Sequence, residues 1–329
     1  MTLPKDQLLC GDVLELLPQL PDRSVQLVIT SPPYYRQRNY AAGPQEIGNE
    51  PTVQEYLSRL LAVFRECCRV VRNDGSLVFN LGDKYQDGGL LLIPYRFAQA
   101  VLEEGLAFLV NVITWVKRNP TPRQFRRRLV PATEPFFHFA KTKRYYYNLD
   151  EFQTGRGAGS SQRAGSRVGQ RYFTLIERSD LSAEQKAAAR EALQQAIEEV
   201  RSGRIAGFRM KIRGIHAEPF GGQSGGRQYH LERNGFTIIR IHGRPIKRDV
   251  IETPVETLPG TGHPAVYPVR VVEEFLRLLT RPGDLVLDPF VGSGTTAVAC
   301  RRTGRHFIGI DLSSEFLEIA RRRLQEVRR

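Results

Sequence analysis

The sequence predicts an α/β protein with a mostly parallel, doubly wound sheet, and two observations support this fold class. Strand-like apolar runs alternate with helical patterns over the first 150 residues, and the last 50 residues return to the same alternation. The segments between them are rich in glycine, serine and arginine instead. Strands that alternate with helices are typical of a parallel sheet covered by helices on both faces.

The first part of the chain gives the clearest individual elements. A buried strand is predicted at 24–30 ("SVQLVIT"), and a helix at 52–72, where Thr52 and Glu55 form a capping box. Three more strands are predicted at 74–83, 107–118 and 134–142, and a helix that ends at a glycine at 92–105.

The middle and the end of the chain differ in texture. In the middle, a helix is predicted up to Gly203, with a capping box formed by Ser182 and Gln185. Flexible basic loops are predicted on either side of it, at 154–171 and 220–228. The C-terminal segment is predicted to form strands at 284–290 and 306–311, each followed by a helix.

The composition is that of a globular protein, with 41% hydrophobic and 25% charged residues. No apolar run is long enough to span a bilayer, and "MTLPKDQLLCGD" lacks a signal-peptide pattern, so we expect a cytoplasmic protein. The four cysteines do not have the spacing of zinc ligands. We therefore expect no metal site, and buried free thiols at Cys10, Cys67, Cys68 and Cys300.

The positive charge is concentrated in the middle third of the chain. The net charge is +13, and residues 117–249 hold 27 Lys and Arg against 12 Asp and Glu. The rest of the chain is nearly neutral, with 21 against 23. This asymmetry favours a region that faces a polyanion such as nucleic acid, although a solvated arginine-rich surface would have the same composition.

A glycine-rich corner, "DPFVGSGTTA" (288–297), is expected to bind a cofactor. Gly292 and Gly294 allow a tight strand-to-helix turn beside a ligand, and Asp311 ends the next strand, where a carboxylate suits ribose hydroxyls. A P-loop would need a lysine after Gly294. A dinucleotide site, or a turn that binds nothing, stays open. S-adenosylmethionine (AdoMet) fits best because it needs no phosphate grip.

The position of this corner near the chain end predicts a permuted sheet. The C-terminal strands become strands one and two, "QLLCGD" (7–12) supplies strand three, and 24–30 becomes strand four. Strands one and four are neighbours at the switch point of a doubly wound sheet, where ligands bind at the carboxyl ends. "SPPY" (31–34), which follows strand four, should therefore lie beside the cofactor.

These two motifs, in this order, resemble a known family. Ser31-Pro32-Pro33-Tyr34 matches the [DNS]PP[YFW] motif, and 288–294 matches the DPFxGSG motif, of site-specific DNA amino-methyltransferases of the permuted (β) group. The resemblance covers about 1–150 and 245–329, and the SPPY form is similar to the cytosine-N4 enzymes. It implies a circularly permuted, Rossmann-like AdoMet-dependent methyltransferase fold. A catalytic half is expected at 1–145, an inserted target-recognition region at 146–255 and an AdoMet-binding half at 256–329.

The chemistry and the resemblance together predict roles for individual residues. We expect the Ser31 hydroxyl and the Pro32 carbonyl to accept hydrogen bonds from the target amine, Pro33 to fix the corner, and Tyr34 to stack on a flipped-out base. Asp83 is a candidate to face the ring nitrogen of the base or to receive a proton. The candidate cofactor contacts are Asp12, His263, Pro268, Asp288, Pro289, Phe290, Gly292, Ser293, Gly294, Thr295, Thr296 and Asp311. The candidate DNA contacts are Asn119, Arg123, Arg126, Arg127 and Arg128.

The resemblance implies AdoMet as cofactor and double-stranded DNA as substrate. It leaves open a functional pairing with a restriction endonuclease, and a monomer or a homodimer. Methylation of a cytosine ring carbon needs a nucleophilic cysteine, usually after proline, and none of the four follows a proline. Ser31 favours cytosine N4, and adenine N6 stays the alternative. A non-catalytic nucleic-acid-binding protein with an AdoMet or dinucleotide site is the alternative from another class.

Overall fold

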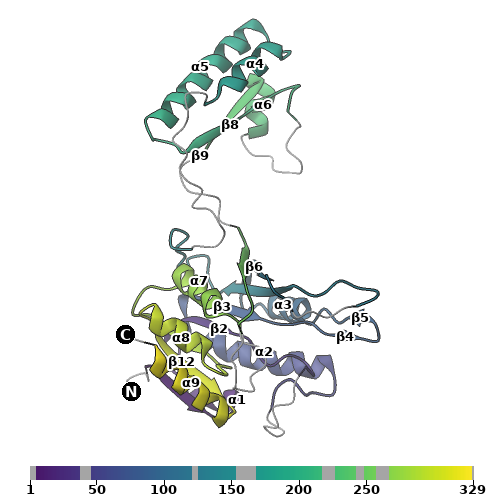
Figure 1. Ribbon diagram of the computed structural model, residues 1–329, viewed down its shortest axis with the longest axis vertical. Coiled ribbons are helices and arrows are strands. Elements are labelled where there is room, and N and C mark those ends of the chain that lie inside the picture. Colours follow the sequence, from purple (N-terminus) through teal and green to yellow (C-terminus); the bar gives the residue numbers. More distant parts are fainter. Residues whose placement is uncertain are drawn as a thin grey trace. The chain divides into compact units, whose positions relative to one another are not determined.

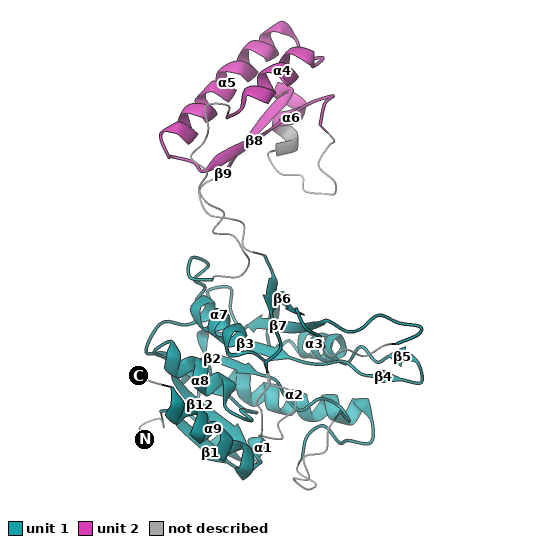
Figure 2. Ribbon diagram, viewed as in Figure 1, with its two compact units in different colours: residues 1–155, 247–329 teal, residues 156–246 magenta. Residues whose placement is uncertain are grey.

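The computed structural model describes residues 5–37, 46–120, 125–152, 168–216, 227–241, 248–256 and 267–327. The chain divides into two compact units (Figure 2). Unit 1 consists of residues 1–155 and 247–329, and unit 2 of residues 156–246. Among the described residues, no helix has the length and apolar character needed to cross a bilayer.

Unit 1 is built on one large sheet and a small separate hairpin. The sheet strands are β1 (Gln7–Cys10), β2 (Val25–Thr30), β3 (Val71–Asn80), β6 (Phe108–Lys117), β7 (Thr133–Ala140), β10 (Val250–Thr253), β11 (Leu285–Asp288) and β12 (His306–Asp311). The hairpin consists of β4 (Tyr85–Gln86) and β5 (Gly89–Leu90). The order in the sheet is β1-β12-β11-β2-β3-β7-β6-β10 (Figure 1).

This strand order confirms the predicted permuted, doubly wound fold. β11, β12, β1 and β2 take the places of strands one, two, three and four, and β11 lies between β12 and β2. All neighbouring pairs are parallel except those of β7, which runs antiparallel to both β3 and β6. Segments from opposite ends of the chain thus lie side by side at the centre of one sheet.

Helices cover both faces of the sheet (Figure 1). One face packs against α1 (Val13–Leu16), the short 3-10 helix η1 (Leu17–Gln19), α2 (Val53–Val70) and α3 (Ile93–Glu103). The other packs against α7 (Val269–Leu279), α8 (Thr295–Arg302) and α9 (Ser314–Glu326). Along β2, Val28 belongs to the first core, whereas Leu27 and Ile29 belong to the second, because successive side chains of a strand point to opposite faces.

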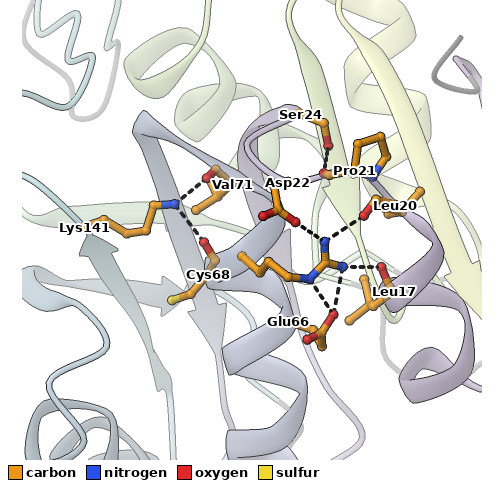
Figure 3. Close-up of polar contacts among 10 residues, drawn as sticks. Leu17, Leu20, Pro21, Asp22, Ser24, Glu66, Cys68, Val71 and Lys141 are labelled. Atoms are coloured by element: carbon orange, nitrogen blue, oxygen red, sulfur yellow. Dashed lines mark hydrogen bonds and ion pairs between the residues drawn. The ribbon is translucent and has the colours of Figure 1, made fainter. Parts of the chain in front are cut away.

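Two cations bind backbone carbonyls near the amino ends of β2 and β3 (Figure 3). Arg69, in the last turn of α2, donates to the carbonyls of Leu17 and Leu20 at 2.8 Å each and also binds Asp22 and Glu66. Lys141 donates to the carbonyls of Cys68 at 2.8 Å and Val71 at 2.6 Å. Both cations lie where the carbonyls of α2 lack intrahelical partners, so they stabilise the end of this helix.

Three details of unit 1 differ from the sequence predictions. β10 falls in the range expected for the recognition region, yet it pairs with β6 in the main sheet. β3 begins at Val71, directly after α2, instead of at the turn near Asp74. Cys10 is exposed, because it ends β1 at the edge of the sheet, whereas the other three cysteines are buried as expected.

Unit 2 is a small α/β unit with its own core. It contains α4 (Gln170–Arg178), α5 (Ala183–Arg201), β8 (Gly207–Ile212), α6 (Arg227–Asn234) and β9 (Phe236–Ile241), and β8 and β9 form an antiparallel ribbon. The capping box predicted at Ser182 is present at the start of α5. Leu193 of α5 and Met210 of β8 belong to the core. Most of the two predicted basic loops, 154–167 and 220–226, lies outside the described residues.

Candidate active site

A cleft of about 1560 Å³ opens at the carboxyl ends of the central strands of unit 1. Its lining includes the corner 31–34, which follows β2, and parts of the corner 289–295, which follows β11. β2 and β11 pair in parallel through Val28 and Leu287, so both corners leave the sheet at the same edge. The sheet therefore brings together the two motifs that the sequence singles out.

Asp288 joins these two corners from behind the cleft. Its Oδ1 accepts hydrogen bonds from Thr30 Oγ1 at 2.6 Å and from the backbone N–H of Phe290 at 3.1 Å. Its Oδ2 accepts one from Thr296 Oγ1 at 2.6 Å. Burial raises the pKa of Asp288 to about 6, although the hydrogen bonds from Thr296 and Thr30 lower it. Asp288 and Thr296, both predicted as cofactor contacts, do not line the cleft.

The glycine corner depends on two left-handed residues. Gly292 has a φ of 49°, and its N–H donates to Asp311 Oδ2 at 2.8 Å. Gly294 has a φ of 86°, and a Cβ added there would lie 2.7 Å from the Cβ of Ala320 in α9. A side chain at Gly294 would therefore be strained by its backbone and would also clash with the next helix.

The residues around this corner fit AdoMet. Phe290, Val291 and Phe316 offer apolar surface in the cleft, and the carboxylates of Asp12 and Asp311 line it as well. Burial raises the pKa of Asp311, which also accepts a hydrogen bond from the N–H of Ser313 at 2.9 Å. Apolar surface beside a carboxylate at the end of β12 suits an adenine ring and the hydroxyls of a ribose.

The other predicted cofactor contacts fall into three groups. Pro289, Phe290, Gly292, Ser293 and Thr295 line the cleft together with the two acids. Gly294 and Pro268 do not line it, and they form the N-caps of α8 and α7. His263 lies outside the described residues. Asp12 has a second contact, because it caps α1 by accepting the N–H of Leu14 at 2.8 Å.

The SPPY corner leaves two acceptors facing the cleft. Ser31 Oγ donates to the hydroxyl oxygen of Tyr34 at 3.2 Å, which keeps the lone pairs of Ser31 available. The carbonyl of Pro33 is occupied, because Tyr56 donates to it at 2.8 Å. Among the described residues, no donor binds the carbonyl of Pro32, which lines the cleft. Ser31 and Pro32 are the two residues predicted to accept from the target amine.

A polar cluster that the sequence analysis missed lies next to Tyr34. The Tyr34 hydroxyl lies 2.8 Å from Asn80 Oδ1 and 3.1 Å from Glu134 Oε2. Glu134 forms an ion pair with Lys117, and all four residues line the cleft. Asn80 ends β3 at the switch-point edge, and this position could have marked it as a candidate. Glu134 carries no such signal in the sequence.

Tyr267 is a second residue that the sequence analysis missed. It lines the cleft, and its hydroxyl lies 3.0 Å from Thr296 Oγ1 and 3.5 Å from Asp288 Oδ2. Tyr267 therefore connects the cleft surface to the buried carboxylate behind it. It directly precedes Pro268, the neighbouring residue that the sequence analysis proposed.

Asp83 lines the cleft and also has a structural contact. Its Oδ1 accepts hydrogen bonds from the N–H groups of Lys84 at 2.8 Å and Ile93 at 3.1 Å. Ile93 begins α3, whose N-cap residue, Leu92, provides no side-chain hydrogen bond. Asp83 thus satisfies a backbone donor at the start of α3 from outside the helix.

The basic candidates for DNA contact differ from one another. Arg128 lines the cleft, and its guanidinium carbon lies 3.8 Å from the ring centroid of Tyr85 and 3.9 Å from that of Phe125. This stacking fixes the position of an exposed cation at the cleft. Arg126 and Arg127 are exposed and do not line the cleft.

The remaining two DNA candidates add little to the site. Asn119 does not line the cleft, and its Oδ1 accepts the N–H of Val255 at 2.7 Å. Arg123 lies outside the described residues. The described residues contain no cluster of three or more His, Cys, Asp or Glu suited to a metal ion.

The permuted sheet, the glycine corner at its switch point and the carboxylate that ends the next strand define the AdoMet-dependent methyltransferase class. A family model described as DNA methylase, N6_N4_Mtase, matches residues 25–322, and the chain belongs to this family. It is therefore an amino-methyltransferase of the N6/N4 family, and its cofactor is AdoMet.

Curated relatives align over nearly the whole chain. The type II methyltransferase M.Cfr9I of Citrobacter freundii is 27% identical over 344 aligned residues, which cover 96% of this chain and 86% of that protein. The type II methyltransferase M.SfiI of Streptomyces fimbriatus is 29% identical over 386 aligned residues, which cover 95% of this chain and 90% of that protein.

Solved structures share the fold. The PvuII DNA methyltransferase (cytosine-N4-specific) superposes with a TM-score of 0.59 at 19% identity, over 99% of this chain and 89% of that one. A DNA modification methylase of Thermus thermophilus, TTHA0409, complexed with S-adenosyl-L-methionine, gives a TM-score of 0.53 at 21% identity, over 97% of this chain and 92% of that one.

Proposed function

We propose that the protein is a site-specific DNA methyltransferase that transfers the methyl group of AdoMet to N4 of a cytosine flipped out of the duplex. The observation that carries this proposal is the meeting of the SPPY and glycine corners in one cleft, with Ser31 at the centre of the SPPY corner. AdoMet supplies an electrophilic methyl group when it is bound. A neutral serine hydroxyl at this position favours cytosine over adenine, as does the name of the PvuII enzyme that shares the fold.

The task of the chain's own residues is to make an unreactive amine attack. The lone pair of an exocyclic amine is delocalised into the ring, so the nitrogen is nearly planar and a weak nucleophile. Ser31 Oγ and the Pro32 carbonyl accept its two hydrogens and favour a pyramidal nitrogen whose lone pair faces the methyl group. Two consecutive prolines restrict the backbone, and Tyr56 holds the carbonyl of Pro33, so these acceptors need no reorganisation.

The base must leave the duplex to reach this corner, because an amine inside the stack cannot enter a deep pocket. Tyr34 offers its ring to the flipped base. The position of its ring requires a glycine at Gly82, since a Cβ there would lie 2.3 Å from Tyr34 Cε2. Arg128, held between two aromatic rings at the cleft, is suited to a backbone phosphate next to the target.

Unit 2 is proposed as the target-recognition region. Its residues, 156–246, hold 16 Lys and Arg against 8 Asp and Glu. In β8, Met210 and Ile212 are buried in the core of the unit, so the alternate residues Arg209 and Lys211 point to the opposite face of the ribbon. A two-stranded ribbon fits the major groove of DNA, where the edges of the base pairs can be distinguished.

The relatives named type II methyltransferases favour a place in a restriction–modification system. In such a system this chain would protect the sites that a partner restriction endonuclease cleaves. Co-expression tests this directly: with the partner nuclease, cells survive only if the chain methylates the shared sequence.

Nucleoside mass spectrometry tests the chemistry. DNA from a host without methyltransferases of its own, but expressing this chain, should contain N4-methylcytosine. N6-methyladenine instead would replace the proposed target by the adenine alternative. Unmodified DNA, together with tight binding of AdoMet and duplex by the purified chain, would favour a non-catalytic binding protein.

A further inference from the structure

We propose that Glu134 accepts the proton released by methyl transfer, at the end of a hydrogen-bonded chain that runs from Ser31 through Tyr34. This inference rests on the proposed function, and it assigns the polar cluster beside the SPPY corner. Ser31 would touch the target amine and is the catalytic residue. Tyr34 and Glu134 act through it and are positioning residues.

The direction of the hydrogen bonds supports such a chain. Ser31 Oγ donates to the Tyr34 oxygen at 3.2 Å, and the Tyr34 hydroxyl in turn reaches Glu134 Oε2 at 3.1 Å. Each hydroxyl thus donates away from the substrate side and toward the carboxylate. Ser31 is left as an acceptor for an amine hydrogen, and a carboxylate at the far end strengthens that acceptor through the shared hydrogen bonds.

Tyr34 has one hydroxyl hydrogen and two acceptors within reach. Asn80 Oδ1 lies at 2.8 Å, and its orientation is fixed because Asn80 Nδ2 donates to the carbonyl of Pro135 at 3.0 Å. An amide oxygen can hold this hydrogen but cannot take the proton, whereas the Glu134 carboxylate can do both. Asn80 therefore holds the phenol in place, and Glu134 offers the exit.

The surroundings explain why the proton passes through Tyr34 without resting there. Burial, and next the charge of Glu134, raise the pKa of Tyr34 well above its ordinary value, so a free tyrosinate is disfavoured. The phenol must gain a proton from Ser31 as it gives one away. Lys117 pairs with Glu134 and balances its charge within the cleft.

The transfer step balances along this route. A carbon–nitrogen bond forms, the carbon–sulfur bond breaks, and the methylated amine holds one surplus proton. This proton moves to Ser31 Oγ while the Ser31 proton moves to Tyr34 and the Tyr34 proton to Glu134, which becomes neutral. Glu134 lines the cleft with 17% of its side chain exposed, so it can return the proton to water before the next turnover.

Single-turnover methyl transfer from labelled AdoMet to duplex DNA tests the chain of hydrogen bonds. Glu134→Gln should lower the rate about 100-fold, the scale of a lost acid–base group. The dissociation constants for AdoMet and DNA should stay within about twofold, because binding does not use this proton acceptor. The residual rate should rise with pH, since hydroxide then replaces the carboxylate. Tyr34→Phe should show the same loss, and Glu103→Gln, an exposed glutamate on α3, should behave as the wild type.

Chemical rescue separates the proposed role from mere structural support. Glu134→Ala leaves room for a small carboxylate beside Lys117, and formate should restore at least about a tenth of the lost rate, whereas chloride at equal ionic strength should not. A folded Glu134→Ala or Glu134→Gln protein with the wild-type rate and pH profile would overturn the inference. If these variants do not fold, an unchanged rate in Tyr34→Phe would overturn it. A wild-type protein that transfers no label would overturn the proposed function itself.

Discussion

Thr30 donates a hydrogen bond of 2.6 Å to Asp288, a residue 258 positions later in the chain. Thr30 is the last residue of β2, directly before the SPPY corner, and Asp288 is the last of β11, directly before the glycine corner. Both side chains are buried, with 0% and 2% of their surfaces exposed. One hydrogen bond thus joins the catalytic corner to the cofactor corner across the permuted ends of the chain.

Removal of the Thr30 hydroxyl should destabilise unit 1. Thr30→Val keeps the shape of the side chain but leaves an oxygen of the buried Asp288 without this donor, which should lower the free energy of unfolding by about 1–3 kcal/mol. Urea unfolding followed by the fluorescence of Trp115, the single tryptophan and a buried residue of unit 1, measures the change. Thr174→Val, at an exposed position of α4, is the control and should unfold as the wild type does.

Two glycines with the same backbone conformation should respond differently to alanine. Gly294 and Gly283 both have a φ of 86°, but an added Cβ meets Ala320 at 2.7 Å only at Gly294, whereas at Gly283 nothing lies within 4 Å. Each substitution should cost about 1 kcal/mol of stability through backbone strain. Gly294→Ala alone should also weaken AdoMet binding, by about tenfold or more, because the clash displaces the corner. Equal AdoMet affinities in calorimetry would show that the corner is not part of the cofactor site.

Stability should depend on pH through Asp288. Its pKa is raised from 3.8 to about 6 in the folded protein, mainly by burial, so the folded state binds its proton more tightly than the unfolded state. Its contribution to stability is therefore present below pH 3.8 and is lost as the pH rises through 6, by up to about 3 kcal/mol. Relative to Asp288→Asn, the wild type should lose stability over this interval.

His138 should have the opposite effect in nearly the same interval. Its ring is buried with Nε2 3.0 Å from Ser76 Oγ, and burial lowers its pKa from 6.5 to about 4. The unfolded chain takes up this proton first, so acidification from pH 6.5 to 4 should remove up to about 3 kcal/mol of stability. His138→Gln should abolish that loss and expose the opposite dependence due to Asp288. Unfolding curves of both variants that run parallel to the wild type at every pH would contradict these assignments.

The meeting of the two motifs could be predicted from the sequence because it depends on rules of chain connectivity. Parallel strands joined by helices place their carboxyl ends at one edge, and the order of the motifs along the chain determines which strands are neighbours. The pairs that follow from these rules, β11 with β12 and β11 with β2, are present. The capping boxes at Thr52 and Ser182 could also be predicted, because they involve only residues three apart.

The acidic wall of the cleft could not be predicted, because it depends on the direction of one strand. β7 runs antiparallel to β3, so its beginning, not its end, lies at the edge where the parallel strands end. Glu134 therefore reaches the cleft from a position that a parallel arrangement would place at the opposite edge. In the same way, the contact of Asp83 with the start of α3 follows from the lack of a capping side chain at Leu92, which is apparent only in the folded chain.

The account depends most on Ser31 as an acceptor for the target amine rather than as a part of the cofactor site. The most direct test measures label transfer from AdoMet to duplex DNA by the wild type and by Ser31→Ala, together with the AdoMet dissociation constant of each. We expect the wild type to label DNA, and Ser31→Ala to transfer the label about 100-fold or more slowly with an AdoMet affinity within about twofold of the wild type. An equal loss of transfer rate and AdoMet affinity, or an unchanged transfer rate, would contradict the central claim.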